Sequence, residues 1–297
     1  MSSSRLQEDR LVHEHGFPLS AEVQLKLKAL KASRPELSSV SRLPLETWLK
    51  QFSNKADQET ALLLLEKVQL FDLDATRSGL QKIHHQLFST DGLNPEKTRL
   101  SYLGAGKSGA LMAYFYRQAN NVKADANIPE KHFLEFNQMG ASICPATQAP
   151  VENLAIIDDI ILSGRQSIEY LEALKEKFKA YKQIDLYCLA GTEKGVERVQ
   201  KAFPNIRVRV VQHIQHIYEG GKNALFNDAE KGRIKDLLER YSHRFPVNGI
   251  LKPKQREGLV VFFYNSPDET IPLLTHKGTG PNGWKPPFPR YWGEKVD

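Results

Sequence analysis

The pattern of hydrophobic and polar positions divides the chain into a helical first part and a second part in which strands and helices alternate. Residues 21–31 are ambiguous between helix and strand, whereas apolar residues recur at helical spacing from 44 to 87. Short apolar runs predict strands at 99–103, 133–136, 153–157, 184–190, 206–211 and 259–264. Helical patterns are expected at 110–119, 168–178, 193–203 and 227–241. This alternation predicts an α/β fold with a parallel sheet.

We therefore expect two domains, a helical N-terminal region over 1–92 and a strand-and-helix domain over 93–297. The helical region has two interpretations, a cap packed on the next domain or a winged-helix-like module for DNA. The cap is favoured because no run of arginine and lysine marks a recognition helix. The end of the chain, rich in glycine, proline, tryptophan and basic side chains, is expected to be loop.

The composition is that of an ordinary globular protein, with 40% hydrophobic and 26% charged residues among 297. Two cysteines cannot build a disulfide framework, and the longest apolar runs are far too short to cross a bilayer. The N-terminal residues lack the apolar core of a secretory signal, so we expect a cytoplasmic protein with no membrane partner. A net charge of +6 favours anionic partners but does not choose between nucleotides, nucleic acid and lipid.

The most informative stretch runs from 154 to 167, Leu-Ala-Ile-Ile-Asp-Asp-Ile-Ile-Leu-Ser-Gly-Arg-Gln-Ser. A buried strand is expected to end in Asp158 and Asp159, and a turn with Ser163 and Gly164 then begins a helix. Ligands of open α/β sheets lie at the C-terminal ends of strands, and a helix N-terminus binds phosphate. Paired carboxylates suit ribose hydroxyls or a Mg²⁺ ion. The stretch therefore predicts a sugar-phosphate site, and the alternative is an acidic strand end with an ordinary helix cap.

A second loop, between a predicted strand and a predicted helix, is rich in glycine. Glycines let backbone amides approach an anion closely, and Lys107 adds a positive charge. The loop is a candidate anion site, and the alternative is a plain turn between strand and helix. Its candidate residues are Gly104, Ala105, Gly106, Lys107 and Ser108.

A P-loop NTPase is a rival interpretation, because Gly106, Lys107 and Ser108 match the end of a P-loop. The first glycine of that motif would stand at 101, where this chain has Ser101 inside a predicted strand. The remaining loop is too short to cradle a triphosphate, so this interpretation is the less favoured one.

The stretch around the paired aspartates resembles the 5-phosphoribosyl-1-pyrophosphate (PRPP) signature of type I phosphoribosyltransferases. That signature is an apolar strand, two acidic residues, three variable residues and Ser/Thr-Gly-x-Ser/Thr, which Asp158, Asp159, Ser163 and Gly164 match. The resemblance implies a Rossmann-like parallel-sheet domain in which catalytic Asp158 and Asp159 hold the ribose hydroxyls, directly or through Mg²⁺. It implies that Lys107 and the glycine-rich loop bind pyrophosphate. It also implies a cradle for the 5′-phosphate, made by Leu162, Ser163, Gly164, Arg165, Gln166 and Ser167.

Two positions depart from the signature. Gln166 stands where the second hydroxyl residue is usual, and Ser167 is displaced by one. Leu162 stands where relatives that use 6-oxopurines have an aspartate that serves as a base. Leucine cannot move a proton, so we do not expect purine salvage.

A wider resemblance covers 48–65, 104–120, 158–167 and 258–274, in this order. These segments are similar to phosphoribosyltransferase-like effectors of bacterial anti-phage conflict systems, some of which sit beside retron reverse transcriptases. The resemblance implies a role in phage defence with a reverse transcriptase or nucleic acid as partner. Related phosphoribosyltransferases are often dimers, so a homodimer is one option by analogy, and the sequence leaves the oligomeric state open.

The tail mixes aromatic, proline and basic residues. Trp284 and Phe288 are weak candidates for stacking on an acceptor base, or on single-stranded nucleic acid. The alternative is a tail held across the domain by buried aromatic side chains.

These observations favour an enzyme that binds PRPP, or a ribose 5-phosphate nucleotide, with Mg²⁺ and displaces pyrophosphate at the anomeric carbon. The second hypothesis is a non-catalytic nucleotide sensor, acting as a partner-binding subunit of a defence complex.

Overall fold

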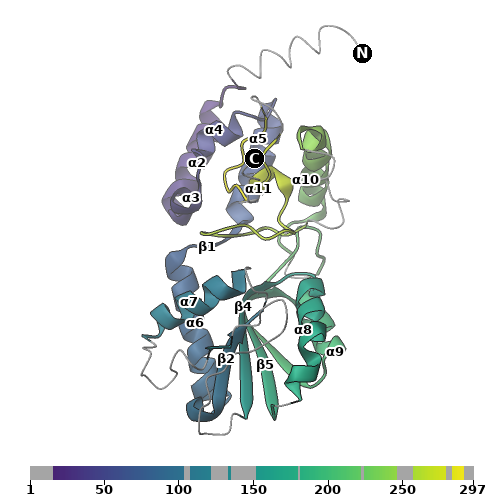
Figure 1. Ribbon diagram of the computed structural model, residues 1–297. Coiled ribbons are helices and arrows are strands. Elements are labelled where there is room, and N and C mark those ends of the chain that lie inside the picture. Colours follow the sequence, from purple (N-terminus) through teal and green to yellow (C-terminus); the bar gives the residue numbers. More distant parts are fainter. Residues whose placement is uncertain are drawn as a thin grey trace, which may run out of the picture. The chain divides into compact units, whose positions relative to one another are not determined.

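A computed structural model describes residues 16–103, 108–121, 133–134, 152–179, 181–221, 224–245, 257–278 and 283–290. These residues form two compact units. The first unit combines the chain up to Asp72 with the chain from Gln215 onward, and the second runs from Leu73 to Ile214. Figure 1 labels most of the helices and several of the strands of the two units.

This division differs from the expected boundary between 92 and 93. The C-terminal segment packs its apolar side chains on the N-terminal helices, so Trp284 and Phe288 share one core with Trp48. The helix that follows Leu73 belongs instead with the sheet, where a Cβ placed on Gly79 would lie 2.6 Å from the Leu189 side chain. The boundary between the two units therefore depends on contacts between segments that are distant in sequence. The change from a helical pattern to alternating strands and helices does not mark it.

The first unit is mostly helical, and side chains fix where several of its helices begin. Ser20, Asn54 and Asn227 each accept a backbone N–H three residues later, which satisfies a free donor of the first turn. A short parallel pair joins its two strands. Its elements are α2 (Ala21–Ser33), α3 (Glu36–Val40), α4 (Leu45–Leu49), α5 (Lys55–Lys67), β1 (Gln69–Phe71), α10 (Asp228–Tyr241), η4 (Ser242–Arg244), β7 (Val260–Phe262) and α11 (Pro272–Thr275).

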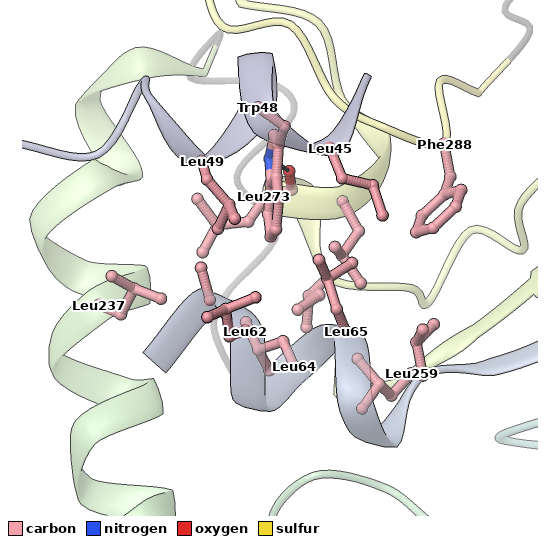
Figure 2. Close-up of a cluster of buried hydrophobic side chains, with 14 of the residues drawn as sticks. Leu45, Trp48, Leu49, Leu62, Leu64, Leu65, Leu237, Leu259, Leu273 and Phe288 are labelled. Carbon is pink, nitrogen blue, oxygen red and sulfur yellow. Dashed lines mark hydrogen bonds between the residues drawn. The ribbon is translucent and has the colours of Figure 1, made fainter. Parts of the chain in front are cut away.

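The core of the first unit lies between α4, α5, α10 and the C-terminal segment (Figure 2). Trp48 and Leu49 of α4 face the leucines of α5, and Leu237 of α10 closes one side. Each fully buried side chain of this size contributes roughly 1.5–3 kcal/mol through burial. The N-terminal helices are thus part of one core with the end of the chain.

The second unit is a five-stranded parallel sheet in the order β3-β2-β4-β5-β6, flanked by helices. Helices α8 and α9 cover one face and α6 and α7 the other (Figure 1). The predicted α/β fold with a parallel sheet is confirmed. The elements are α6 (Leu73–His85), η1 (Gln86–Thr90), η2 (Pro95–Lys97), β2 (Thr98–Tyr102), α7 (Ser108–Ala119), β3 (Phe133–Leu134), β4 (Asn153–Ile161), α8 (Arg165–Phe178), β5 (Gln183–Thr192), α9 (Glu193–Ala202) and β6 (Ile206–Ile214).

Strand β4 is longer than the predicted 153–157 and continues through both aspartates to Ile161. The reason is its pairing with β5, which matches Asp158 to Cys188 and Ile160 to Ala190. Backbone hydrogen bonds of a parallel ladder do not depend on side-chain polarity, so polar residues do not end the strand.

Within the described part of the chain, no helix combines the length and the apolar character needed to span a membrane.

Candidate functional site

The order of the strands reverses between β2 and β4, and this is where the candidate site lies. The chain leaves β2 toward β3 on one side and returns to β4 on the other. In open parallel sheets, the C-terminal ends of strands at such a reversal form a ligand-binding crevice. Tyr102, the last residue of β2, pairs with Ile157, so the end of β2 lies beside the two aspartates. The predicted acidic segment, which is still part of β4, thus lies beside the end of the strand that precedes the predicted glycine-rich loop.

Asp158 and Asp159 occupy consecutive positions in β4, and their carboxyl groups are close enough to interact. Asp158 is partly buried and Asp159 is buried, and the Asp159 N–H donates to Asp158 Oδ1 at 3.0 Å. Burial, followed by the neighbouring Asp159 carboxylate, raises the pKa of Asp158 well above its usual range. The pair is therefore held together at a cost in charge repulsion that a hydroxyl group or a cation would offset.

Cys188 pairs with Asp158 across β4 and β5 and is fully buried. Burial raises the pKa of its thiol well above the usual value, and the two carboxylates add to this rise. A buried, protonated thiol is a poor nucleophile, so Cys188 takes a packing role beside the site.

The turn after β4 is tight and leads directly into α8. Gly164 has φ +72°, and a Cβ there would lie 2.7 Å from the Gly195 carbonyl oxygen, so only glycine fits. Leu162 and Ser167 are buried, whereas Arg165 and Gln166 are exposed. The Arg165 N–H donates to Ser163 Oγ at 3.5 Å. Because the first turn of a helix presents N–H groups without intrahelical acceptors, this turn offers donors to an anion.

The two candidate loops differ in how much of them the structure describes. Gly104, Ala105, Gly106 and Lys107 lie outside the described residues. The ends of that loop are described, because Leu103 follows β2 and Ser108 begins α7. A Cβ on Gly109 would lie 2.4 Å from the Leu103 carbonyl oxygen, so α7 starts directly against the end of β2.

Ser101, which stands where a P-loop would have its first glycine, is a buried residue of β2. This placement agrees with the sequence argument against a P-loop NTPase.

Trp284 and Phe288 lie in the first unit and are buried in its core. The Trp284 indole N–H donates to the Leu273 carbonyl oxygen at 2.8 Å, and the Phe288 N–H donates to the Leu274 oxygen at 3.0 Å. The tail is thus held by buried aromatic side chains, as one of the two interpretations expects. Side chains in this arrangement have no free ring face for stacking on a base.

Sequence reasoning missed a group of residues that holds the turn after β4. The Thr192 hydroxyl donates to the Leu162 carbonyl oxygen at 2.6 Å, and an Arg198 N–H donates to the Ser163 carbonyl oxygen at 3.4 Å. Thr192 could have been recognised as the N-cap of a helix, since it ends a strand pattern. Its contact with a turn 30 residues earlier had no signal in the sequence.

The two carboxylates suit a magnesium ion that is held partly by the protein and partly by its substrate. Among the described residues, no cluster of three or more histidine, cysteine or carboxylate side chains could cage a metal. Mg²⁺ usually keeps several waters and is bound by one or two carboxylates together with substrate phosphates. Asp158 and Asp159 therefore fit a magnesium ion that arrives with a phosphorylated substrate.

Comparisons with known proteins show which family the chain resembles. A family model described as PRTase-CE matches residues 45–290, which is most of the chain. No curated protein sequence matches the chain.

Several solved structures are similar in fold. The AQ2163 protein of Aquifex aeolicus is 13% identical, with 72% of this chain and 95% of that chain covered and a TM-score of 0.33. The orotate phosphoribosyltransferase of Aeropyrum pernix is 11% identical, with 57% and 75% covered and a TM-score of 0.33. The purine phosphoribosyltransferase of Pyrococcus horikoshii is 14% identical, with 52% and 98% covered and a TM-score of 0.31. With the family match over most of its length, the chain belongs to the PRTase-CE family of phosphoribosyltransferase-like proteins.

Proposed function

We propose that this protein binds PRPP, or a ribose 5-phosphate nucleotide, together with Mg²⁺, and that with PRPP it displaces pyrophosphate from the anomeric carbon. One observation carries the proposal. The segment from Asp158 to Ser167 crosses from the C-terminal end of β4 into α8, at the point where the strand order reverses. Carboxylates and helix N–H groups at one strand end match the two halves of a ribose 5-phosphate.

Each part of the ligand has a proposed partner. Asp158 and Asp159 hold the ribose 2′ and 3′ hydroxyls, and the turn from Leu162 to Ser167 holds the 5′-phosphate. Lys107 and the glycine-rich loop hold the pyrophosphate. Bound Mg²⁺ neutralises charge on the pyrophosphate oxygens.

The proposed transfer is a substitution at the anomeric carbon of the ribose. The bond between the anomeric carbon and a pyrophosphate oxygen breaks, and pyrophosphate leaves with the electron pair. An acceptor nucleophile forms the new bond to the anomeric carbon and gives up a proton to solvent or buffer. The residues contribute by positioning and by neutralising charge, since none of them forms a bond to the substrate.

A second candidate function is a ligand sensor without transfer activity. Gln166 does not supply the hydroxyl that the type I signature has at its position, and the buried apolar Leu162 does not supply the carboxylate that relatives using 6-oxopurines have there. A sensor would bind the same ligand and release no pyrophosphate.

The resemblance to effectors of conflict systems supports a proposed role in anti-phage defence, with a reverse transcriptase or nucleic acid as partner. Phage should form fewer plaques on cells that carry this gene together with its neighbouring genes than on cells that lack them. The double variant Asp158→Ala, Asp159→Ala should restore plating if ligand binding is needed for protection.

Ligand binding is tested by thermal unfolding with PRPP, with and without Mg²⁺. Ligand at about a hundred times its dissociation constant should stabilise the fold by about 2.7 kcal/mol, or several degrees. The double variant Asp158→Ala, Asp159→Ala should lose this shift. A matched control is Glu172→Ala, Glu176→Ala, which removes two exposed carboxylates from α8 and should keep it.

The outcomes separate the candidate functions. A Mg²⁺-dependent shift lost in the aspartate variant, with pyrophosphate release in the presence of an acceptor, supports the transferase. The same shift without release under any acceptor supports the sensor. A shift with ATP and none with PRPP, together with release of phosphate from ATP, would overturn the proposal in favour of a nucleoside triphosphatase.

A further inference from the structure

The turn that would bind the 5′-phosphate is attached to the next strand and helix by buried contacts. Thr192, at the end of β5, is almost fully buried, and its hydroxyl donates to the Leu162 carbonyl oxygen at 2.6 Å. The same hydroxyl accepts the Gly195 N–H at 3.0 Å. One side chain therefore caps α9 and also fixes a carbonyl group of the turn after β4.

Two glycines bring the backbones of the two turns into direct contact. A Cβ on Gly195 would lie only 2.0 Å from the Leu162 carbonyl oxygen. A Cβ on Gly164 would lie 2.7 Å from the Gly195 carbonyl oxygen and 3.0 Å from the Val199 side chain. Neither position leaves room for a side chain, since backbone atoms form most of the surroundings.

A third contact holds the middle of the turn. A guanidinium N–H of Arg198, on α9, donates to the Ser163 carbonyl oxygen at 3.4 Å. Leu162, Ser163 and Gly164 are consecutive, and each is in contact with the β5–α9 junction. This junction therefore determines how the carbonyl groups of the turn point, and so the direction of the N–H groups that alternate with them.

We propose that Thr192 and Gly195 are positioning residues, which set the affinity of the turn after β4 for the 5′-phosphate without touching the ligand. This inference rests on the proposed function of the turn. A phosphate held by backbone N–H groups needs those groups aligned before it binds, because aligning them afterwards costs binding free energy. Buried contacts to the carbonyl side of the same peptides supply that alignment.

Two substitutions test the role of these contacts. Thr192→Val keeps the shape of the side chain but removes the hydroxyl, and Gly195→Ala forces the Leu162 carbonyl group to move. In the full chain, each should weaken binding of PRPP with Mg²⁺ by about tenfold, Thr192→Val because a buried acceptor loses its donor and Gly195→Ala because the Leu162 carbonyl group is displaced. Thr192→Ser keeps the hydroxyl and should retain the wild-type affinity, measured by calorimetry.

Matched controls separate a local role from a loss of overall stability. Asn227→Ala removes the N-cap of α10 and Gly232→Ala changes a glycine of α10 whose Cβ would meet nothing within 4 Å. Both residues belong to α10 of the first unit, whereas the turn belongs to the second, so both variants should keep the affinity for PRPP. Hydrogen exchange without ligand gives a second readout. The amides of 163–167 should exchange faster in Thr192→Val than in the wild type. In Asn227→Ala their exchange rates should equal those of the wild type.

The possible results are distinguishable. If the wild type binds neither PRPP nor ribose 5-phosphate, the proposed function is overturned, and the positioning role for phosphate with it. If the wild type binds and Thr192→Val and Gly195→Ala bind equally well, the positioning role alone is overturned. Equal losses in Thr192→Ser and Thr192→Val would also overturn it, because the hydroxyl would then not be the cause.

Discussion

Trp48 and Trp284 donate their indole N–H groups to the same acceptor, the carbonyl oxygen of Leu273, at 3.1 and 2.8 Å. Their rings meet edge to face, with centroids 6.5 Å apart. A carbonyl oxygen has two lone pairs, and both are used here by residues from opposite ends of the chain. This shared acceptor fastens the C-terminal tail to α4 within the core of the first unit.

The first prediction concerns that tail. Trp284→Ala should destabilise the first unit by roughly 3–5 kcal/mol, because it empties a large buried volume. Trp284→Phe should cost less, since Trp48 still satisfies the Leu273 oxygen. Urea unfolding followed by circular dichroism measures both. Lys285→Ala is the neighbouring exposed control and should stay within about 0.5 kcal/mol of the wild type. Wild-type stability of Trp284→Ala would contradict the role of the tail in the core.

The second prediction compares two glycines that both have positive φ. Gly164→Ala should cost roughly 2–4 kcal/mol, from left-handed backbone strain together with a clash against the Gly195 carbonyl group. Gly92→Ala has similar strain at φ +67° but no atom within 4 Å of the new Cβ, so it should cost about 1–2 kcal/mol. Chemical denaturation of the two variants gives the difference. Equal losses would mean that the turn after β4 is not tightly seated.

A third prediction addresses the buried carboxylate of Asp185 in β5. Arg207 donates to it through two nitrogens, at 2.9 and 2.8 Å, while Asp185 is fully buried. Arg207→Met should destabilise the second unit by up to about 3–5 kcal/mol, because an unpaired charge would remain buried. The loss is smaller to the extent that water reaches the Asp185 carboxylate once the arginine is removed.

The double variant Asp185→Leu, Arg207→Met should recover much of that loss, since no charge is left without a partner. Lys175→Ala, which breaks an exposed pair with Glu172, serves as the control and should change stability by no more than about 1 kcal/mol. Additive effects in the double variant would argue against a coupled pair.

The fourth prediction is a pH dependence. His84 is half-buried, its Nδ1 lies 2.6 Å from the Tyr116 hydroxyl, and burial lowers its pKa below the usual value. The folded state therefore favours the neutral ring, and protons bind the unfolded chain first. The neutral His84 ring contributes its full share to the stability of the fold above about pH 6.5, the pKa of histidine in the unfolded chain. This share is lost as the pH falls from there through the lower pKa that His84 has in the folded state.

Thermal unfolding between about pH 8 and about pH 5 tests this dependence. His84→Gln, which can still bond to Tyr116, should lose stability less steeply below about pH 6.5 than the wild type. His85→Gln, at the exposed neighbouring position, should follow the wild-type curve. Identical curves for wild type and His84→Gln would refute the assignment.

The sequence alone determined the fold class and the candidate phosphate turn. Alternating strand and helix patterns are local, and the stretch from Asp158 to Ser167 carries its carboxylates, its glycine and its helix start within a few residues. Even the ambiguous stretch at 21–31 is explained locally, because the Ser20 side chain caps the helix there. Patterns of this kind survive in sequence because neighbours in the chain are also neighbours in space.

Only the tertiary structure decided which distant segments meet. The position of β2 between β3 and β4, the contact of Thr192 with Leu162 and the burial of Trp284 against Trp48 all join residues far apart in the chain. Apolar periodicity says that a face will be buried but not which other face covers it. The same limit explains why the two compact units differ from the expected division at 92 and 93, since the C-terminal segment shares one core with the N-terminal helices.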